Sequence, residues 1–408
     1  MTILFVSNYF PPEVNAPANR LSEHARVWVQ REREVEVLTA VPNFPEGRIY
    51  DGYRNRLTRE TVDGIETLRV PMYVAPNQGT VRRTLSYLSF MISAAWFAGK
   101  VRRRPEVVVA TSPQFFAALG GWQVARRFQV PFVLEIRDLW PDSIVAVGAL
   151  PDSPLIRLFR RLERFVYRKA DHIVVVTESF RDKLIADGVP PEKLSVVRNG
   201  VDLGSVQCPS SESLKTRRRE LGLQDRFVAS YVGTMGMAHR ADVLLDAAER
   251  CVDENIVFVL AGAGAEVDRI RERGRDLSNV LVLPKLPRRE ALDIVALSDV
   301  SVVHLRRSPL FRTVIPSKMF EAMAMGTPVL LGVEGEAREI LEEAGGGLAF
   351  EPEDPDALLR CIERLKANPE LQIQLAAAGV RHVAQHFDRR VLAERYLEIL
   401  DRVTHRWV

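Results

Sequence analysis

The sequence predicts an α/β protein built from two doubly wound parallel sheets. Short, almost uninterrupted apolar segments alternate with helical patterns, as is typical of strands buried on both faces of a parallel sheet. The alternation starts again after residue 225, and one sheet of about ten or more such strands would be unusual. The stretch at 204–213, GSVQCPSSES, has the most linker-like composition of the chain. We therefore expect a first domain at 1–204 and a second at 205–387.

The expected strands fall into two sets. In the first domain they are Ile3–Ser7, Val35–Thr39, Val107–Ala110, Phe132–Ile136 and Ile173–Val176. In the second domain they are Phe227–Val232, Ile256–Leu260, Val280–Leu283, Val300–Leu305 and Val329–Leu331. Ligands of such sheets bind beyond the carboxyl ends of the strands, so we expect functional residues in the loops that follow them.

The composition is that of a globular protein with a basic first half. Of the 408 residues, 47% are hydrophobic and 27% are charged. Residues 1–200 hold 28 Lys and Arg against 21 Asp and Glu, which predicts an anionic partner for this half. The cysteines, Cys208, Cys251 and Cys361, are far apart and lack metal-ligand spacing, so we expect a reducing compartment without disulfides. No signal peptide is expected, because the apolar run Thr2–Val6 is too short.

The strongest candidate for a site is the stretch Ser308–Val329, which connects two expected strands through a helix at 317–325. The helix N-terminus at Ser317 has unpaired N–H groups and about half a positive charge, which suits a diphosphate. Glu321 can accept both hydroxyls of a ribose, and Lys318 can neutralise phosphate. Alternatively, Lys318 and Glu321 form an i,i+3 ion pair on a solvated face. The helix is apolar almost all round, however, which predicts burial and a need for polar partners.

The segment PSKMFEAMAMGTPVL resembles the donor-binding segment of retaining GT-B glycosyltransferases of the family-four type. That family has Glu, seven residues, Glu, and then Ala-Met-Ala-x-Gly-x-Pro-Val. Glu321 falls on the second Glu, whereas Thr313 replaces the first. The variant TVIPSK is similar to the amino-sugar (N-acetylfucosamine-like) transferases of bacterial O-antigen and capsule biosynthesis. In the wider family the first Glu holds hydroxyls of the donor sugar, so Thr313 leaves that sugar open.

This resemblance covers nearly the whole chain and implies the GT-B fold, in which two Rossmann-like domains have a cleft between them. It implies that the first domain binds the acceptor and that the second binds the nucleotide sugar. It also implies that the last helix, at 388–408, packs back on the first domain.

Loops of the second domain contain the rest of the expected donor site. The glycine loop that begins at Gly233 lets backbone N–H groups approach a phosphate. Arg240 presents a bidentate fork to the leaving diphosphate, and His239 stands where most relatives have Lys or Gln. By resemblance, the loops after the next two strands contribute as well. The expected donor-binding residues are Gly233, Thr234, Gly236, His239, Gly262, Gly264, Lys285, Leu286, Thr313 and Ser317.

In the first domain the expected acceptor-side residues follow three strands. Asn15 lies in the first loop, which lacks the GxGxxG pattern of an NAD site and is either a rigid connection or a ligand contact. Asn43 lies in the loop after the second strand. The stretch RDLWP resembles the same transferase subgroup and contains Arg137, Asp138 and Trp140. The resemblance makes Asp138 an acceptor contact or catalytic helper with Arg137 as its partner. The alternative is an ion pair that braces the loop.

Two segments of the first domain suggest contact with a membrane surface. Thr84–Gly99 has sixteen residues without a charge and follows Arg82 and Arg83. As a helix it would be about 24 Å long, too short for a bilayer core of ~30 Å. It is either buried in the domain or lies in the plane of an anionic membrane, as the Arg-rich amphipathic segment Leu155–Lys169 favours. The aromatic residues expected to insert are Tyr87, Phe90, Trp96 and Phe97.

Two residue pairs imitate metal motifs. Asp354 and Asp356 precede a helix, where acidic caps are common. His382 and His386 have i,i+4 spacing but lack a third ligand and a general-base Glu. We therefore expect no metal and no cofactor, with basic side chains stabilising the leaving group instead.

Together these features predict a retaining glycosyltransferase that moves an N-acetylated amino sugar from a UDP-linked donor to a lipid-linked glycan. The expected catalytic residues are Asp138, Arg240, Lys318 and Glu321. The expected partners are the nucleotide sugar, a polyprenyl-diphosphate-linked glycan and the anionic inner face of the cell membrane, with the protein in the cytoplasm and no nucleic acid. Two alternatives remain open. One is a GT-B nucleotide-sugar epimerase, and the other is a non-catalytic assembly subunit that kept the fold.

Overall fold

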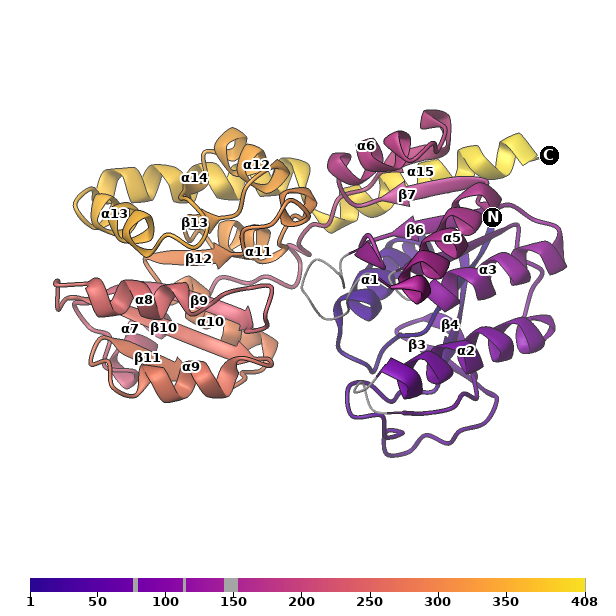
Figure 1. Cartoon of the computed structure of the whole chain (residues 1–408), viewed down its shortest axis with the longest axis horizontal. Helices are drawn as coiled ribbons and strands as arrows, with labels where there is room; N and C mark the ends of the chain where they lie inside the picture. The colour runs from indigo at the N-terminus through magenta and orange to yellow at the C-terminus, as the bar shows by residue number, and fades with distance from the viewer. Residues whose placement is uncertain (76–79, 113–114, 143–152, 408) are drawn as a thin grey trace. The chain divides into compact units, whose positions relative to one another are not determined.

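The computed structural model describes residues 1–75, 80–112, 115–142 and 153–407. By their internal contacts the described residues form two compact units (Figure 1). Unit 1 comprises Met1–Arg198 and Arg389–Val408, and unit 2 comprises Asn199–Asp388. The chain therefore leaves unit 1 at residue 198, a few residues before the boundary expected at 204.

Unit 1 is built on an eight-stranded sheet with the order β3-β4-β2-β1-β5-β6-β7-β8. Its strands are β1 (Thr2–Ser7), β2 (Glu34–Ala40), β3 (Thr58–Val62), β4 (Ile65–Val70), β5 (Val107–Ser112), β6 (Phe132–Ile136), β7 (His172–Val175) and β8 (Leu194–Val196). Neighbouring strands are parallel except β3 and β4, which form an antiparallel hairpin at one edge. The five strands predicted for this domain are present. The edge strands β3 and β8, and β4 next to β3, were not predicted.

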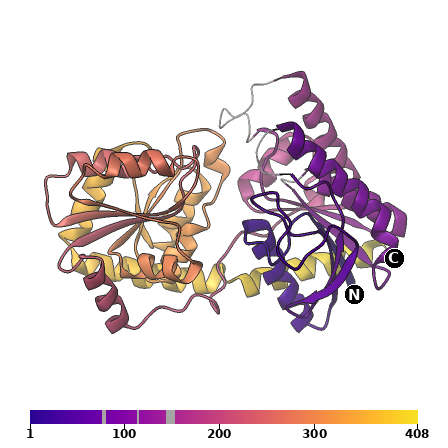
Figure 2. The ribbon, with the colours of Figure 1, turned by 90° about the horizontal axis from the view of Figure 1, so that it is seen from below.

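The helices of unit 1 are α1 (Ala16–Gln30), α2 (Thr80–Phe97), α3 (Phe115–Phe128), α5 (Pro154–Lys169), α6 (Glu178–Ala186) and α15 (Arg389–Trp407). The last helix lies beside α1 (Figure 2). Trp28 of α1 donates its indole N–H to the carbonyl of Ala393 at 2.9 Å, and its ring meets that of Tyr396 edge-on. Both rings are fully buried. The C-terminal helix is thus part of the core of unit 1.

Unit 2 is built on a six-stranded parallel sheet with the order β11-β10-β9-β12-β13-β14. Its strands are β9 (Phe227–Thr234), β10 (Ile256–Ala263), β11 (Val280–Leu283), β12 (Val300–His304), β13 (Val329–Gly332) and β14 (Gly347–Ala349). The five strands predicted here are present, and only the short edge strand β14 was missed.

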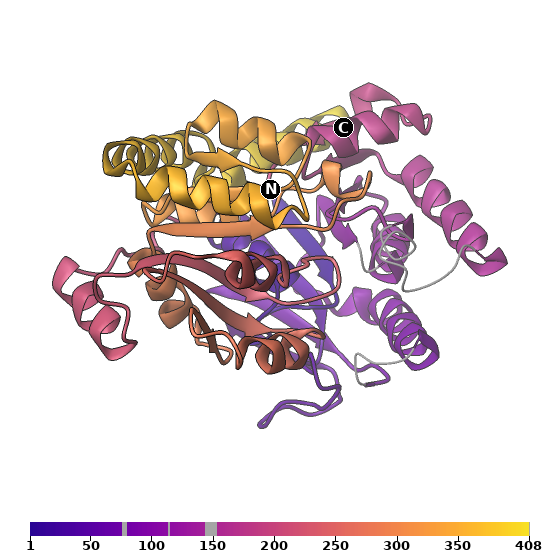
Figure 3. The same cartoon turned by 60° about the vertical axis from the view of Figure 1, so that its left-hand side comes forward.

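Helices cover both faces of this sheet (Figure 3). They are α7 (Ser211–Glu220), α8 (Val243–Arg250), α9 (Val267–Gly274), α10 (Arg288–Leu297), α11 (Lys318–Ala324), α12 (Glu336–Ala344), α13 (Pro355–Lys366) and α14 (Pro369–His386). The linker-like stretch at 204–213 runs into α7, whose first turn is capped by Ser210. The predicted class, two doubly wound α/β domains, is confirmed.

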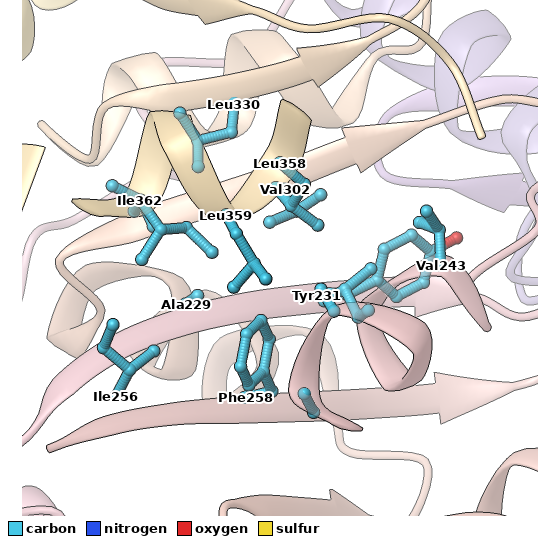
Figure 4. Packing of buried hydrophobic residues seen from close by; sticks show 14 of the residues in the cluster. Ala229, Tyr231, Val243, Ile256, Phe258, Val302, Leu330, Leu358, Leu359 and Ile362 are labelled. Atoms are coloured by element: carbon cyan, nitrogen blue, oxygen red, sulfur yellow. The ribbon is translucent and has the colours of Figure 1, made fainter. Parts of the chain in front are cut away.

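The core of unit 2 includes one residue with a hydroxyl group near the end of a central strand. In Figure 4, Tyr231 and Phe258 from the strands pack in one cluster with Leu358 and Ile362 of α13. Burying large apolar side chains on both sides of a strand is what fixes its position in the sheet. Tyr231 is the one member with a polar tip, which lies near the end of β9. The core thus holds a hydroxyl at the strand end.

The two pairs that imitate metal motifs have structural contacts. The carboxylate of Asp354 accepts the backbone N–H of Ala357 at 2.9 Å, so the predicted helix cap is confirmed. Asp356 pairs with Arg250 at 2.7 Å. Within the described ranges, no group of three or more His, Cys, Asp or Glu has the arrangement of a metal site.

Candidate functional site

The candidate site lies at the carboxyl ends of β9 and β10 in unit 2, beside the first turn of α11. The two strands stay paired to their last residues, with Gly262 opposite Gly233. A Cβ on Gly262, where φ is +157°, would lie only 1.8 Å from the carbonyl oxygen of Gly233. Glycine is therefore required for this close approach of the two backbones.

Lys318, the first residue of α11, reaches across to this strand end. Its Nζ donates to the hydroxyl of Tyr231 at 2.8 Å and lies 4.1 Å from the centre of that ring. A Cβ on Gly233 would lie 2.5 Å from Cε of Lys318. Gly233 thus provides the space that Lys318 occupies, and the aromatic ring provides a favourable cation–π contact.

The charge of Lys318 is finely balanced. Burial lowers the pKa of its ammonium to about 7, and the nearby Glu321 opposes this shift. In the part of the chain that the structure describes, no carboxylate lies within 4 Å of its Nζ. The surface ion pair with Glu321, which the sequence left open, is therefore not formed. An anionic ligand would supply the missing counter-charge.

Glu321, one turn further along α11, is half-buried. Its nearest cation is Arg288 of α10, whose guanidinium lies 3.6 Å from Oε1. Burial raises the pKa of this carboxyl group, and Arg288 and Lys318 oppose the shift. No hydrogen bond from another described residue to its oxygens is formed, so the carboxylate keeps its capacity to accept ligand hydroxyls.

His304, at the end of β12, holds the glycine loop and was not predicted. Its Nδ1 lies 2.9 Å from the carbonyl oxygen of His239, and its Nε2 lies 2.9 Å from the backbone N–H of Glu353. A carbonyl only accepts, so Nδ1 carries the proton and Nε2 accepts. Burial lowers the pKa of His304, in agreement with the neutral ring that these two contacts require. This histidine therefore ties two loops together at the strand ends.

Arg240 and His239 are less available than the sequence suggested. The guanidinium of Arg240 binds Asp242 and Glu353, each at 3.1 Å, so its fork is already occupied by carboxylates. Burial lowers the pKa of His239 to about 4, which leaves the imidazole neutral at pH 7. The cation nearest Gly233 is thus Lys318, and a role of Arg240 at the phosphate requires that it exchange its partners.

The other predicted donor residues lie around this cluster. Thr234 and Gly264 are exposed at the strand ends, and Gly236 is half-buried in the loop between β9 and α8. Lys285 is exposed beyond β11, whereas Leu286 packs against the apolar cluster beside α10. Ser317 precedes α11 without a side-chain cap. Thr313 donates its hydroxyl to the carbonyl of Leu310 at 2.6 Å.

In unit 1, two predicted acceptor residues have structural contacts. Asn15 caps α1 by accepting the backbone N–H of Ala18 at 3.0 Å. Asn43 is 6% exposed, and its amide donates to the carbonyl of Val41 at 2.8 Å. Both side chains hold their loops in shape, and neighbouring residues form the exposed surface of the second loop.

The RDLWP stretch follows β6 and is partly packed. The ring of Trp140 stacks on Phe115, with ring centres 5.6 Å apart, and lies 4.9 Å from Phe159 of α5. Burial lowers the pKa of Arg137 to about 10, opposed by Glu135 and, more weakly, by Asp138. Its Nε has no hydrogen-bond partner among the described residues. Trp140 therefore braces α5, and Arg137 keeps an unused donor.

Helix α2 has both a buried and an exposed face. Phe90 is fully buried, so the expectation that it inserts into a membrane is wrong. Leu85, Ile92 and Trp96 are 51%, 61% and 76% exposed, which also overturns the alternative that the whole segment is buried. Their spacing of seven and four residues places them on one side of the helix. No helix among the described residues is long and apolar enough to cross a membrane.

Known proteins resemble both halves of the chain. Residues 15–200 match the family model described as glycosyl transferase 4-like domain, and residues 214–382 match glycosyl transferases group 1. The colanic acid biosynthesis glycosyl transferase WcaI of Escherichia coli is 26% identical over 383 residues, covering 91% of this chain and 93% of the relative. The glycosyltransferase WbjE of Pseudomonas aeruginosa is 26% identical and covers 72% and 70%.

A solved structure has the same architecture. Anabaena HepE in complex with UDP superposes with a TM-score of 0.73 at 17% identity, covering 98% of this chain and 100% of that chain. At this identity the similarity establishes the fold. Because each half also matches a glycosyltransferase family model, the chain belongs to the glycosyltransferases of the GT-B fold, with a family 4-like first domain and a group 1 second domain.

Proposed function

We propose that this glycosyltransferase takes its sugar from a UDP-linked donor and retains the configuration of the anomeric carbon. The observation that carries the proposal is the cluster of Tyr231, Lys318 and Glu321. Among the described residues, it combines a cation whose hydrogen-bond partner is neutral with a carboxylate that has unused acceptor capacity. A nucleoside diphosphate supplies both complements, phosphate for the cation and a ribose diol for the carboxylate. Complexes of HepE with UDP and with UDP-glucose support this choice of ligand.

Glu321 is assigned to the ribose. A carboxylate has two oxygens and accepts two hydroxyl donors side by side. Hydrogen bonds from hydroxyls stabilise the ionised form, so ribose binding would reverse the upward pKa shift that burial causes. Arg288, at 3.6 Å, keeps the carboxylate oriented without filling its acceptor positions.

Lys318 is assigned to the leaving diphosphate. During transfer the bond between the anomeric carbon and the diphosphate oxygen breaks, and negative charge gathers on that oxygen. The acceptor hydroxyl then forms the new bond on the same face, and its proton passes to the departing phosphate. A preorganised ammonium in a partly buried site stabilises this charge more than it stabilises the bound substrate. Its effect therefore falls mainly on turnover.

The donor sugar is proposed to be an N-acetylated amino sugar. Thr313 stands where the resembled family has a glutamate for sugar hydroxyls, and its own hydroxyl is hydrogen-bonded to Leu310. A neutral side chain of this kind does not select for a hydroxyl pair in the way a carboxylate does. This leaves room for a sugar with a substituted hydroxyl or an acetamido group.

The acceptor is proposed to be a polyprenyl-diphosphate-linked glycan of a surface polysaccharide, reached from an anionic membrane surface. The name of WcaI, colanic acid biosynthesis glycosyl transferase, supports a role in polysaccharide assembly. The exposed apolar stripe of α2 lies near Arg82 and Arg83, and α5 exposes Leu155 and Leu158 along an Arg-rich helix. Such surfaces bind membranes by shallow insertion and charge attraction.

Vesicle flotation tests the membrane part. We expect the protein to float with vesicles that contain anionic lipid and to stay down with purely zwitterionic ones. Replacing both Ile92 and Trp96 by Glu should abolish flotation, whereas Trp407→Glu on α15, where the ring is also half-exposed, should not. Arg102 and Arg103 are poor targets because they pair with Glu66 and Glu34. Equal flotation of the stripe variant and the wild type would refute membrane docking through α2.

An activity screen tests the function itself. Purified protein is incubated with a panel of UDP-, GDP- and ADP-sugars, with and without membrane extract that contains lipid-linked glycans. We expect sugar transfer from a UDP-sugar only when the acceptor is present. Interconversion of the nucleotide sugar without acceptor would favour the epimerase instead. Binding of no nucleotide under any condition would favour the non-catalytic subunit.

A further inference from the structure

The loop between β2 and β3 in unit 1 frames a hollow of about 930 Å³, together with Pro12 from the loop after β1. Small-molecule sites commonly have volumes of about 300–1,000 Å³ and combine apolar walls with a few polar groups. The hollow lies beyond the carboxyl end of β2, on the side of the sheet where ligands of doubly wound domains bind.

Its walls have the chemistry of a carbohydrate site. The rings of Phe44, Tyr50 and Tyr53 line it, and the charged side chains of Glu46, Arg48 and Asp51 stand around them. A sugar has an apolar face of C–H groups that packs on aromatic rings and a rim of hydroxyls that binds charged side chains. The lining residues include two carboxylates and one guanidinium, a balance that does not favour a phosphate or nucleotide. A neutral, hydroxyl-rich ligand fits these walls best.

The ring of Tyr50, one of the lining residues, is held in place by hydrogen bonds within the loop. The backbone N–H of Tyr50 donates to the carbonyl of Pro42 at 3.1 Å, and its hydroxyl donates to the carbonyl of Phe44 at 2.5 Å. The backbone N–H of Tyr53 returns to Tyr50 at 3.1 Å. The guanidinium of Arg69 lies over the ring of Tyr53, 5.1 Å from its centre. A preformed wall of this kind lowers the entropy cost of binding.

Glu13, which lies in the loop after β1, fixes the conformation of the loop after β2. It is 1% exposed, and one carboxylate oxygen accepts the backbone N–H groups of Asn43 and Phe44, each at 2.9 Å. The fully buried Arg69 donates to the carbonyls of Ala40 and Pro11, which join the same two loops. A buried carboxylate is costly unless it is hydrogen-bonded, so this arrangement depends on the loop keeping its shape.

We propose that this hollow binds a carbohydrate chain, with Tyr50 as the ring on which a sugar unit packs and Glu13 as the positioning residue. The inference rests on the proposed function, because it assigns the glycan part of the acceptor to the loop at 41–57. The exposed Arg48, Glu46 and Asp51 then bind hydroxyls of the glycan. Asn43, which the sequence suggested as an acceptor contact, acts through the loop rather than by touching the glycan.

A glycan array of soluble bacterial and mammalian oligosaccharides, probed with the full chain, tests the hollow without any donor. We expect the wild type to bind at least one oligosaccharide and Tyr50→Ala to weaken that binding by tenfold or more. Tyr73→Ala is the matched control, since Tyr73 is exposed on the same unit outside the hollow and should leave binding unchanged. Unchanged binding by Tyr50→Ala, or no binding by the wild type, would overturn the proposal.

Two further measurements separate the positioning role from general stability and from the proposed function. Glu13→Gln retains one oxygen acceptor and should stay within a few-fold of the wild type in glycan affinity, whereas Glu13→Ala should lose tenfold or more. The affinity for UDP, measured by calorimetry on the same variants, should not change. If UDP does not bind the wild type while the glycan does, the proposal of UDP-dependent transfer is refuted and the proposal of a glycan site in the hollow is supported. If UDP binds and no glycan does, only the proposal that the hollow binds a glycan is refuted.

Discussion

Glu13 in unit 1 is buried and Lys318 in unit 2 is partly buried. The pKa of each lies at about 7, but their surroundings are opposite. Burial raises the pKa of Glu13, against three backbone N–H groups and Arg69. Burial lowers the pKa of Lys318, whose direct partner among the described residues is the neutral hydroxyl of Tyr231. The carboxylate is hydrogen-bonded by its own fold, whereas no counter-charge contacts the ammonium within the described part of the chain.

This difference distinguishes a scaffold from a binding site. A buried polar group with all its partners specifies the shape of the chain around it. A buried charge without a counter-ion destabilises the folded state and is compensated when an oppositely charged ligand binds. Glu13 therefore fixes the conformation of the loop after β2. Lys318 and Glu321 are instead available to bind a ligand.

The largest effect is expected from Lys318→Met. Removing one preorganised donor to a developing negative charge costs about 10²–10³ in turnover. We expect a loss in kcat of this size, measured by sugar transfer, with a much smaller change in the affinity for uridine monophosphate.

Lys215→Met is the matched control, because Lys215 is exposed on α7 of the same unit. It should transfer sugar at the wild-type rate. Turnover of Lys318→Met at the wild-type level would show that the ammonium has no part in stabilising the leaving group. Lys318 would then not differ in function from a structural residue such as Glu13.

Glu13 should contribute to stability in the opposite sense to an ion-paired carboxylate. Its pKa rises from 4.5 to about 7 on folding, so the folded state holds the proton more tightly between these values. The free energy of unfolding should therefore fall by about 3 kcal/mol as pH rises from 4.5 through 7, and Glu13→Gln should lack this change. Tyr9 and Tyr50 also face Glu13, and burial raises the pKa of both hydroxyls further above this window.

Tryptophan fluorescence during urea unfolding measures this effect selectively. The tryptophans of the chain are residues 28, 96, 122, 140 and 407, and all of them belong to unit 1. The wild type and Glu13→Gln should differ more at pH 8 than at pH 5, with the variant the more stable of the two at pH 8. A difference that is the same at both pH values would mean that Glu13 is already ionised throughout, like an ordinary salt-bridged carboxylate.

A smaller effect is expected from Glu321→Gln. Loss of a charge-assisted hydrogen bond to a ribose hydroxyl costs about 1.5–3 kcal/mol, which weakens UDP binding by roughly 10- to 150-fold. Isothermal titration calorimetry measures the change directly. Glu212→Gln, on the exposed side of α7, should bind UDP as the wild type does. Equal affinity of Glu321→Gln and the wild type for UDP would show that this carboxylate does not bind the ribose.

No effect is expected from removing divalent metal. The charge of the leaving diphosphate is assigned to Lys318, so incubation with EDTA should leave transfer unchanged. A loss of activity that magnesium or manganese restores would contradict this assignment. It would mean that metal, rather than the ammonium, neutralises the diphosphate.

The sequence was most informative where function depends on neighbours along the chain. Lys318 and Glu321 lie one turn apart on one short helix, so their pairing with a strand end could be predicted from a local pattern. The strands of unit 2 were equally clear because they are almost uninterrupted apolar runs. The edge strands β3 and β14 were missed because Thr58–Val62 is mostly polar and has no fully buried residue, and Gly347–Ala349 is only three residues long.

The sequence was least informative where partners are far apart. The hydrogen-bond partners of His304 lie in loops 49 and 65 positions away, and nothing local distinguishes it from any histidine at the end of an apolar strand. The ion pair of Arg240 with Asp242 could have been predicted from the sequence, because Asp242 follows two residues later. Its second partner, Glu353, is 113 positions away and is brought close only by the fold. Glu13 likewise needs a loop 30 residues further along.

The most direct test of the account is the proton balance of UDP binding. In the free protein at pH 8, Lys318 should be mostly neutral, because its pKa lies at about 7. Binding a diphosphate raises that pKa, so calorimetry in two buffers of different ionisation enthalpy should show an uptake that approaches about one proton per UDP. Lys318→Met should bind UDP without proton uptake. Binding of UDP to the wild type without uptake, or the same uptake by the variant, would contradict the central role of Lys318.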